Sequence, residues 1–123
     1  MITFDEFKKI ELVTAKIMDV RDHPNADKLL ILEVDVGNVG DASNPGSQEK
    51  EPVEQRKRQI VAGIQNYYTK NELVGKSIVL VNNLEPAIIR GIQSDGMLLA
   101  ASDEGSLTLL ITEKEIKPGS RIR

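Results

Sequence analysis

Two short segments of the chain carry residue types that bind phosphate and sugar oxygens. The first is HPNADKL, residues 23–29, which holds the amide of Asn25 and the ammonium of Lys28. Pro24 fixes its own φ and keeps the residue before it extended, and Asn25 is suited to a side-chain turn, so a tight turn between two strands is expected. An isolated turn of this kind is most often a simple hairpin connection. If it projects from the rim of a barrel, Asn25 and Lys28 would contact a nucleic-acid backbone.

The second segment runs from Asn82 to Ala101. Arg90 is its only basic residue, and Ser94 stands beside the turn that precedes Met97. Its isoleucines are consistent with the core of an ordinary β connection, and Met97 suits either a core position or an adaptable exposed contact. Burial does not explain Arg90 and Ser94, because a polar side chain gains nothing from burial unless it finds a partner.

A third candidate is the basic run Arg56–Arg58. Three adjacent cations usually mark only a solvated strand entry; the alternative is additional phosphate contacts from Arg56, Lys57 and Arg58, joined by Lys76. The whole chain has 16 basic and 19 acidic residues and a formal net charge of −3, which argues against binding nucleic acid by charge alone. Between Gln55 and Ala100, however, there are six basic and three acidic residues, so this part of the chain is locally basic.

The residue inventory excludes several kinds of chemistry. Without cysteine there is no disulfide, thiol nucleophile or thiolate metal site, and one histidine is too few for a two-histidine metal motif. No phosphate-binding glycine loop or serine-nucleophile motif is present, so no catalytic residue, metal or cofactor is expected. Two phenylalanines and two tyrosines are too few to stack several successive bases, which favours a folded RNA recognised by shape and backbone. The N-terminus lacks a signal-peptide pattern and no apolar run could span a bilayer, so a cytoplasmic location without a membrane partner is expected.

Short elements must position these residues. Two Thr-x-x-Glu capping boxes predict helices at 4–10 and 69–75. Strands are expected at 12–20, 28–36, 58–64, 76–83, 96–101 and 107–111. Alternation breaks at Met18, which suggests a bulge, and the polar composition of residues 38–54 predicts a flexible loop. Short strands with one small helix between the third and fourth are typical of an all-β, five-stranded OB-type barrel.

Five segments carry a family resemblance. They are FKKIELVTAKIMDV, HPNADKLLILEVDVG, RQIVAGI, YYTKNELVGKSIVLVNNLEP and RGIQSDGMLLAA. In this order they resemble the tRNA-binding domain at the C-terminus of many bacterial and plant methionyl-tRNA synthetases, which also occurs in free-standing dimeric tRNA-binding proteins. The resemblance runs from Phe4 to the C-terminus apart from the loop, and HPNADKL followed by S-x-GMLLAA is a specific signature. It implies an OB-fold that holds the outer corner of tRNA by its form and does not catalyse aminoacylation.

The resemblance also implies roles for particular residues. Carried over one at a time, the RNA contacts are Asn25, Lys28, Arg90, Ser94 and Met97. Pairing of two copies through the N-terminal helix and the C-terminal segment would use Phe4, Phe7, Ile116, Pro118 and Ile122. The chain is expected to be a single domain, residues 1–123, with the 38–54 loop as its one departure from the family. No synthetase catalytic domain is evident, so a stand-alone protein or a separately encoded synthetase subunit is expected.

Two alternatives remain open within the same fold. A secretion-chaperone-like branch binds unfolded polypeptide, but it keeps HPNADKL and GMLLAA less completely, and a peptide binder should display an apolar groove. The other alternative is a module that only dimerises a partner enzyme. The expected partners are therefore tRNA, a second copy of the chain and a synthetase such as methionyl-tRNA synthetase, with no DNA.

Overall fold

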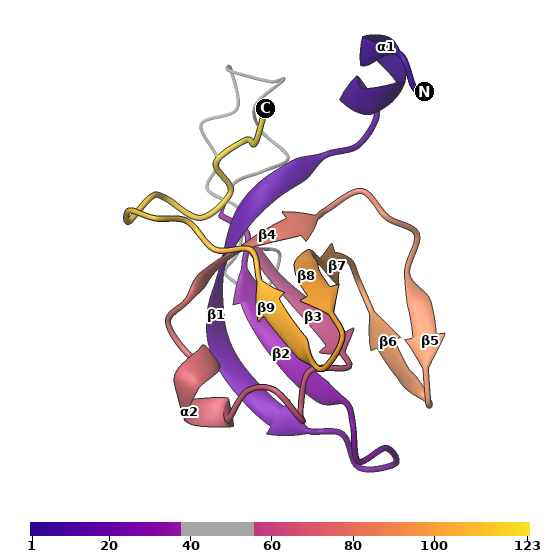
Figure 1. Ribbon diagram of the computed structural model, residues 1–123, viewed down its shortest axis with the longest axis vertical. Coiled ribbons are helices and arrows are strands. Elements are labelled where there is room, and N and C mark those ends of the chain that lie inside the picture. Colours follow the sequence, from indigo (N-terminus) through magenta and orange to yellow (C-terminus); the bar gives the residue numbers. More distant parts are fainter. Residues whose placement is uncertain (38–55) are drawn as a thin grey trace.

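The computed structural model describes residues 1–37 and 56–123, and most of its regular structure is antiparallel β-sheet (Figure 1). A five-stranded sheet has the order β3-β2-β1-β4-β7. Its strands are β1 (Leu12–Asp22), β2 (Leu30–Asp35), β3 (Lys57–Ala62), β4 (Ser77–Val81) and β7 (Met97–Leu98). Two hairpins stand beside it, formed by β5 (Ala87–Ile89), β6 (Ile92–Ser94), β8 (Ala100–Asp103) and β9 (Ser106–Leu109). The sheet curls into a nearly closed barrel, which confirms the expected all-β, OB-type fold.

Alternating side chains of the curled sheet fill the barrel. The inward set is completely or almost completely buried and includes Ala15, Ile17, Leu32, Val34, Ile60, Ile78 and Leu80. Burying one aliphatic side chain of this size contributes roughly 1.5–3 kcal/mol, so this set is a major source of the barrel's stability. The pairing of β1 with β2 shifts register between Ile17 and Asp19, so the expected bulge at Met18 is confirmed. A bulge increases local twist, which helps a long strand bend around a small barrel.

The barrel closes where the chain enters β7. The backbone N–H of Asp95 donates to the carbonyl of Gln59 on β3 at 2.8 Å, and the Ser94 hydroxyl accepts from the N–H of Val61 at 3.0 Å. Gly96 follows with a φ of 152°, and a Cβ there would lie 3.0 Å from the Val81 carbonyl oxygen. The S-x-G sequence is therefore a closure motif, because the hydroxyl replaces a missing strand partner and glycine permits the close approach.

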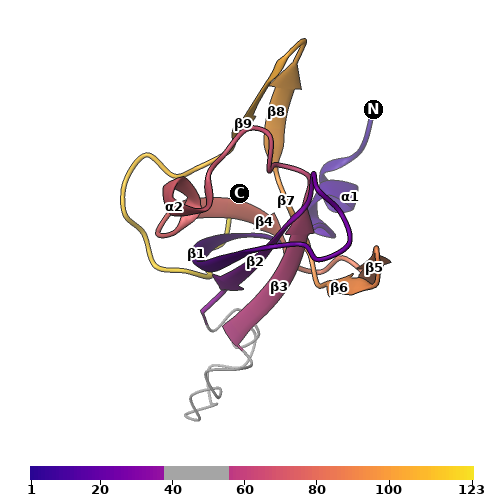
Figure 2. The same ribbon diagram turned by 90° about the horizontal axis from the view of Figure 1, so that it is seen from below.

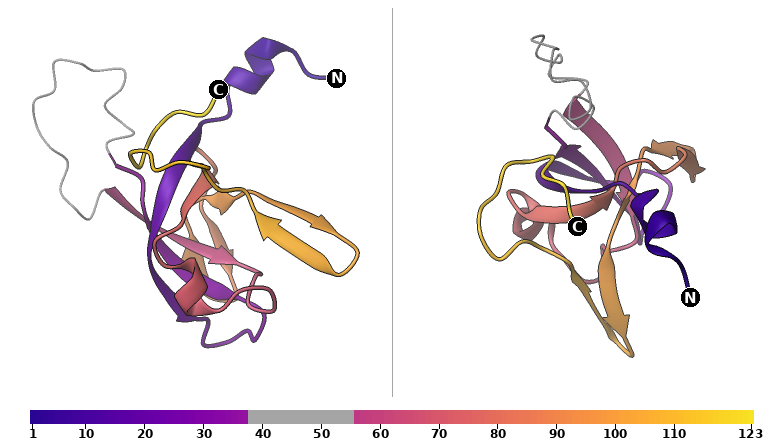
Figure 3. Two further views of the ribbon diagram at one scale, coloured as in Figure 1. Left: turned by 60° about the vertical axis from the view of Figure 1, so that its left-hand side comes forward. Right: turned by 90° about the horizontal axis from the view of Figure 1, so that it is seen from above.

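The C-terminal segment forms a β extension across the barrel. After β9 it meets β4 at Ile111, arches outward, and returns along β1, where the N–H of Gly119 donates to the Thr14 carbonyl and that of Ile122 to the Leu12 carbonyl. The arch is visible at the edge of the barrel in Figures 1 and 3. Gly37, with a φ of 60°, faces the Pro118 carbonyl so closely that no side chain fits between them. The expected C-terminal β extension is confirmed.

Both capping boxes form the helices that they predict. Thr3 caps α1 (Phe4–Lys8) and Thr69 caps α2 (Lys70–Leu73), each with the reciprocal hydrogen bonds to the glutamate three residues on. The Thr69 N–H and hydroxyl lower the pKa of the Glu72 carboxyl, since both favour its charged form. Helix α2 is anchored by the buried Leu73, whereas α1 has no buried residue and projects from the barrel. Both helices end earlier than the ranges 4–10 and 69–75 that the sequence predicts.

The region from 82 to 103 differs most from expectation. Its β5–β6 hairpin was not among the expected strands, and Ile88 on it is 68% exposed rather than part of the core. The expected single strand at 96–101 is divided between β7 and β8, and the β8–β9 hairpin projects from the barrel (Figure 2). The expected loop at 38–54 lies outside the described residues. Across the two described ranges, no helix is long and apolar enough to cross a bilayer.

Candidate nucleic-acid interface

The first expected segment forms a turn at one end of the barrel. It joins β1 to β2 and is closed by backbone hydrogen bonds from His23 to the carbonyl of Leu29 and from Leu29 to that of Ala26. Asn25 and Lys28 are both exposed on this turn. We call residues 23–28 the rim turn, since they lie at the mouth of the barrel.

The second segment forms an arm between β4 and β7, residues 82–96. At its tip, Arg90 has a φ of 52° and Gly91 a φ of 88°, so the two-residue loop is of the type I′ class that matches strand twist. A non-glycine residue in this conformation costs about 1 kcal/mol, and asparagine or glycine would fit better. Arg90 is exposed there, so the strained position presents a guanidinium to solvent at the end of a narrow arm.

The structure brings these two segments together. The Nε2 atom of His23 in the rim turn lies 3.1 Å from the carbonyl oxygen of Ile89, the residue before Arg90. The rim turn and the arm tip are thus neighbours although they are far apart in the sequence. The β1–β2 turn and the tip of the β5–β6 hairpin lie at the same end of the barrel (Figure 1). Asn25, Lys28 and Arg90, which belong to these two segments, consequently share that end.

A row of polar side chains continues the surface between the rim turn and the arm. Arg21 Nη2 donates to the Gln59 side chain at 3.3 Å, and Gln59 Nε2 donates to the carbonyl of Gln93 at 2.8 Å. Gln93 Nε2 in turn donates to the Asp95 carboxylate at 2.6 Å. Sequence reasoning did not single out Arg21. Its position two residues before the rim turn was the signal that could have identified Arg21 as part of this surface.

Ser94 and Met97 have different positions from the other three expected RNA contacts. Ser94 is only 3% exposed, and its hydroxyl accepts from Val61 and donates to the Gly96 carbonyl at 3.2 Å. Its two hydrogen bonds close the barrel, and the hydroxyl is not presented to a ligand. Met97 is 48% exposed at the base of the arm, where it pairs with Val81. Met97 is therefore available for an apolar contact, but at the base of the arm and not at its tip.

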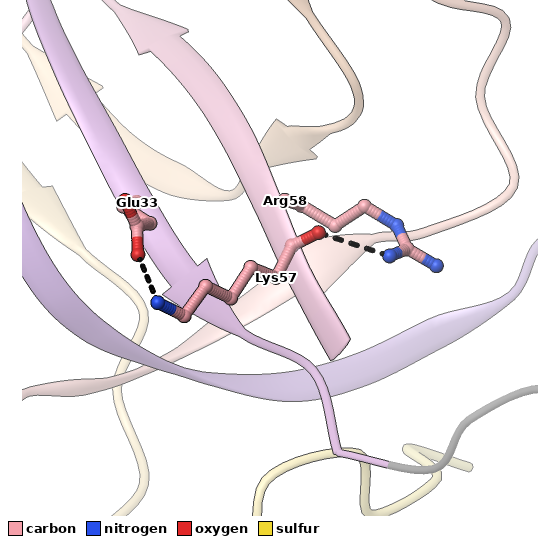
Figure 4. A network of polar contacts seen from close by, with 3 residues as sticks. All are labelled: Glu33, Lys57 and Arg58. Atoms are coloured by element: carbon pink, nitrogen blue, oxygen red, sulfur yellow. Dashed lines mark hydrogen bonds and ion pairs between the residues drawn. The ribbon is translucent and has the colours of Figure 1, made fainter. Parts of the chain in front are cut away.

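The basic run lies at the other end of β3. Lys57 pairs with Asp35 in register, whereas Ala62 pairs with Leu30 next to the rim turn. Lys57 Nζ forms an ion pair with Glu33 at 2.9 Å, and Arg58 Nη1 donates to the Lys57 carbonyl at 3.1 Å (Figure 4). An RNA bound at the rim turn reaches this run only if it continues along the outer face of β2 and β3.

Arg56 and Lys76, the other two cations expected to contact phosphates, lie away from the rim turn. Arg56 lines a shallow hollow with Asp35 and the C-terminal residues Lys117 and Ser120. Lys76 lines a cavity of about 630 Å³ beneath the C-terminal arch. That cavity also has Lys16, Lys114, Lys117, Glu113 and Glu115 on its walls. Arg90 lines neither of these hollows.

The expected pairing residues form two groups. Phe4 is 71% exposed on α1, and Asn83 holds the end of this helix by accepting from the N–H of Glu11 and donating to the Lys9 carbonyl. Phe7 is half-buried on the same helix, and Ile122 lies beside Leu12 at the start of β1. The other two residues are elsewhere: Ile116 lines the cavity under the arch and Pro118 packs against Gly37.

The fold is a five-stranded barrel that carries polar and cationic groups on the β1–β2 turn and on the β4–β7 connection. Nucleic-acid-binding OB domains have this architecture and use these same two connections. The family model described as "Putative tRNA binding domain" matches residues 50–121, and the chain belongs to this family. It is 44% identical over 122 residues to the methionine–tRNA ligase of Thermococcus onnurineus, covering 99% of this chain but only 14% of that enzyme.

Solved structures agree with the family assignment. A MetRS-related protein from Pyrococcus horikoshii superposes with a TM-score of 0.81 at 28% identity, covering 100% of this chain and 98% of the other. The CsaA chaperone protein of Picrophilus torridus also gives a TM-score of 0.81, at 27% identity and with 100% of both chains covered.

Proposed function

We propose that this protein binds tRNA through the rim turn and the tip of the β5–β6 arm. The observation that carries the proposal is the contact between His23 and Ile89, which places the exposed Asn25, Lys28 and Arg90 at one end of the barrel. Family membership and the similarity to methionine–tRNA ligases support tRNA as the ligand. Since tRNA is charged in the cytoplasm, the protein would act there.

The chemistry of these residues suits a ribose-phosphate backbone. Lys28 and Arg90 would pair with phosphates, and the Asn25 amide would bond a phosphate or sugar oxygen. Met97 would supply an apolar contact at the base of the arm. Because the chain has two tyrosines, two phenylalanines and no tryptophan, recognition would depend on the form of the folded RNA rather than on stacked bases. The Arg56–Arg58 run and Lys76 would add phosphate contacts only for an RNA that extends beyond the rim.

A salt series tests this function directly. Filter binding of bulk tRNA should give an affinity that falls with salt, with a slope of log K against log salt of about −2, because each of two phosphate contacts contributes roughly 0.9. Duplex DNA of similar length should bind more weakly. An affinity that does not respond to salt, or equal binding of tRNA and DNA, would rule out this mode of recognition.

The role of the chain in translation follows from the same binding. We propose that it is the tRNA-holding part of a methionyl-tRNA synthetase system, as a stand-alone protein or a separately encoded subunit, and that it performs no catalysis itself. In that role, residues 1–123 act as one domain with an insertion at 38–54. Adding it to a methionyl-tRNA synthetase should lower the KM for tRNA and leave the KM for methionine unchanged.

Pairing of two copies is a separate proposal. Phe4 and Phe7 lie on a helix with no buried residue, held in a defined direction by Asn83, so this apolar surface is suited to a second copy packing against it next to Ile122. Light scattering at micromolar concentration should report twice the chain mass of 13.6 kDa. Phe4→Ser with Phe7→Ser should halve the measured mass while leaving thermal unfolding of the barrel little changed. A monomeric wild-type protein would contradict the proposal.

Binding of unfolded polypeptide is the second candidate function, and the similarity to a CsaA chaperone favours it. The two functions are separated by competition. If tRNA is the ligand, a reduced unfolded protein in excess should displace labelled tRNA poorly. Efficient displacement would favour the chaperone-like function.

A further inference from the structure

His23 is the only histidine of the chain, and both of its ring nitrogens are engaged. It is 5% exposed and lies at the start of the rim turn. Its Nδ1 accepts from the backbone N–H of Asn25 at 2.9 Å, and its Nε2 lies 3.1 Å from the carbonyl oxygen of Ile89. One imidazole thus contacts the backbone of both segments that carry the proposed RNA contacts.

These two partners determine which ring nitrogen donates and which accepts. A backbone N–H only donates, so Nδ1 must be unprotonated, and a carbonyl oxygen only accepts, so Nε2 must carry the hydrogen. The two partners therefore select the tautomer with its hydrogen on Nε2. The two nitrogens have different roles, since Nδ1 shapes the rim turn and Nε2 links that turn to the arm.

Contacts with the barrel must hold the arm, because an isolated two-stranded hairpin is only marginally stable in water. Strand β6 lies against β3, whereas the tip of the arm is held by the bond from His23. Within the described residues, the other hydrogen bonds that tie the arm to the rest of the molecule are at its base. Gln59 and Val61 of β3 bond Gln93, Ser94 and Asp95 on one side, and Lys9 and Glu11 bond Asn82 and Asn83 on the other. The bond from His23 reaches Ile89, next to the strained Arg90 at the tip. Of these bonds, it is therefore the one nearest the guanidinium that is presented to the ligand.

We propose that His23 is a positioning residue for RNA binding, whose Nε2–H bond to Ile89 holds Arg90 at a defined distance from Asn25 and Lys28. This inference rests on the proposed tRNA binding. Loss of the bond would remove none of the side chains that contact RNA, but it would let the arm, and Arg90 with it, move. The protein would then have to order the arm on binding, which should weaken tRNA affinity about three- to tenfold.

Two substitutions separate the roles of the two nitrogens. In His23→Asn, the side-chain oxygen takes the place of Nδ1 and can accept from the Asn25 N–H as in an Asx turn, but the side chain is too short to reach Ile89. In His23→Gln, the amide nitrogen takes the place of Nε2 and can donate to the Ile89 carbonyl. The first variant keeps the bond within the turn and removes the link to the arm. The second keeps the link and removes the Nδ1 acceptor, and the Asn25 N–H can bond water instead because Asn25 is exposed.

Amide hydrogen exchange of the free protein is measured first, because it does not depend on any ligand. We expect the amides that pair β5 with β6 to exchange about tenfold faster in H23N than in wild type, with the β1–β4 core unchanged. In H23Q the same amides should exchange within twofold of wild type. Equal protection of the arm in H23N and wild type would show that the bond does not hold the arm, which would overturn the proposal.

Binding of tRNA over a salt series completes the test. H23N should bind three- to tenfold more weakly with an unchanged salt slope, because no phosphate contact is removed, and H23Q should bind within twofold of wild type. If wild type binds but H23N binds equally well, or H23Q is as weak as H23N, the positioning role is overturned and tRNA binding stands. If wild type binds no tRNA, both proposals fail. If H23N does not fold, H23Q decides the test. Near-wild-type arm protection and tRNA affinity in H23Q support the role, and a tenfold loss of either overturns it.

Discussion

Replacing Lys28 and Arg90 together by alanine should weaken tRNA binding about 100-fold at moderate salt, the largest effect we expect on function. Each residue is exposed at the rim end, and a hydrogen bond to a charged group contributes about 1.5 kcal/mol. The slope of log K against log salt should also become shallower by about 2, since each lost phosphate contact changes it by roughly 1. Each single variant should weaken binding about tenfold and make the slope shallower by about 1. Filter binding over a salt series measures both.

A matched control removes one lysine and one arginine from another part of the surface. Lys114 on the C-terminal arch and Arg123 at the C-terminus are exposed and away from the rim turn. Their double alanine variant should bind tRNA within threefold of wild type, because only long-range attraction is reduced. Equal losses in the two double variants would mean that net charge, and not the rim, provides the affinity.

Replacing Ser94 by alanine should lower the free energy of unfolding by about 1–3 kcal/mol, the largest single-residue effect on stability that we predict. Without its hydroxyl, the buried N–H of Val61 has no acceptor at the point where β3 meets the end of β6. A loss of this size corresponds to a melting temperature lower by roughly 5–10 °C. Well below that temperature, tRNA affinity should remain within twofold of wild type, because the hydroxyl is buried.

Ser102→Ala is the appropriate control for Ser94→Ala. Ser102 is an exposed serine of the β8–β9 hairpin, so its replacement should change the melting temperature by less than about 2 °C. If Ser94→Ala instead keeps full stability and loses tRNA affinity, the hydroxyl contacts RNA directly. Thermal unfolding followed by circular dichroism, combined with filter binding at 20 °C, separates the two roles.

Elements whose stability is local were predictable from the residues alone. The two capping boxes form because threonine and glutamate three residues apart satisfy each other's backbone groups without help from the rest of the chain. The strands β1 to β4 follow from alternating side chains, and the bulge at Met18 follows from the break in that alternation. The rim turn was also predictable, since Pro24 and Asn25 determine its geometry locally.

The β5–β6 arm was not predictable in the same way. Its strands are three residues long and largely exposed, so alternation gives no signal, and Arg90 occupies a loop position that normally holds asparagine or glycine. Ser94 was expected on the surface because a hydroxyl needs a partner when buried. Its partner, the Val61 N–H, comes from a strand distant in sequence and becomes available only when the barrel closes.

The sequence by itself determined the barrel class, the two helix caps and the identity of Asn25, Lys28 and Arg90 as candidate ligands for an RNA backbone. These conclusions depend on local spacing, composition and a specific signature. Only the tertiary structure decided that the rim turn and the arm are neighbours, that Ser94 closes the barrel, and that the basic run lies at the far end of β3. Those facts depend on hydrogen bonds and strand register between distant segments, which no local pattern encodes.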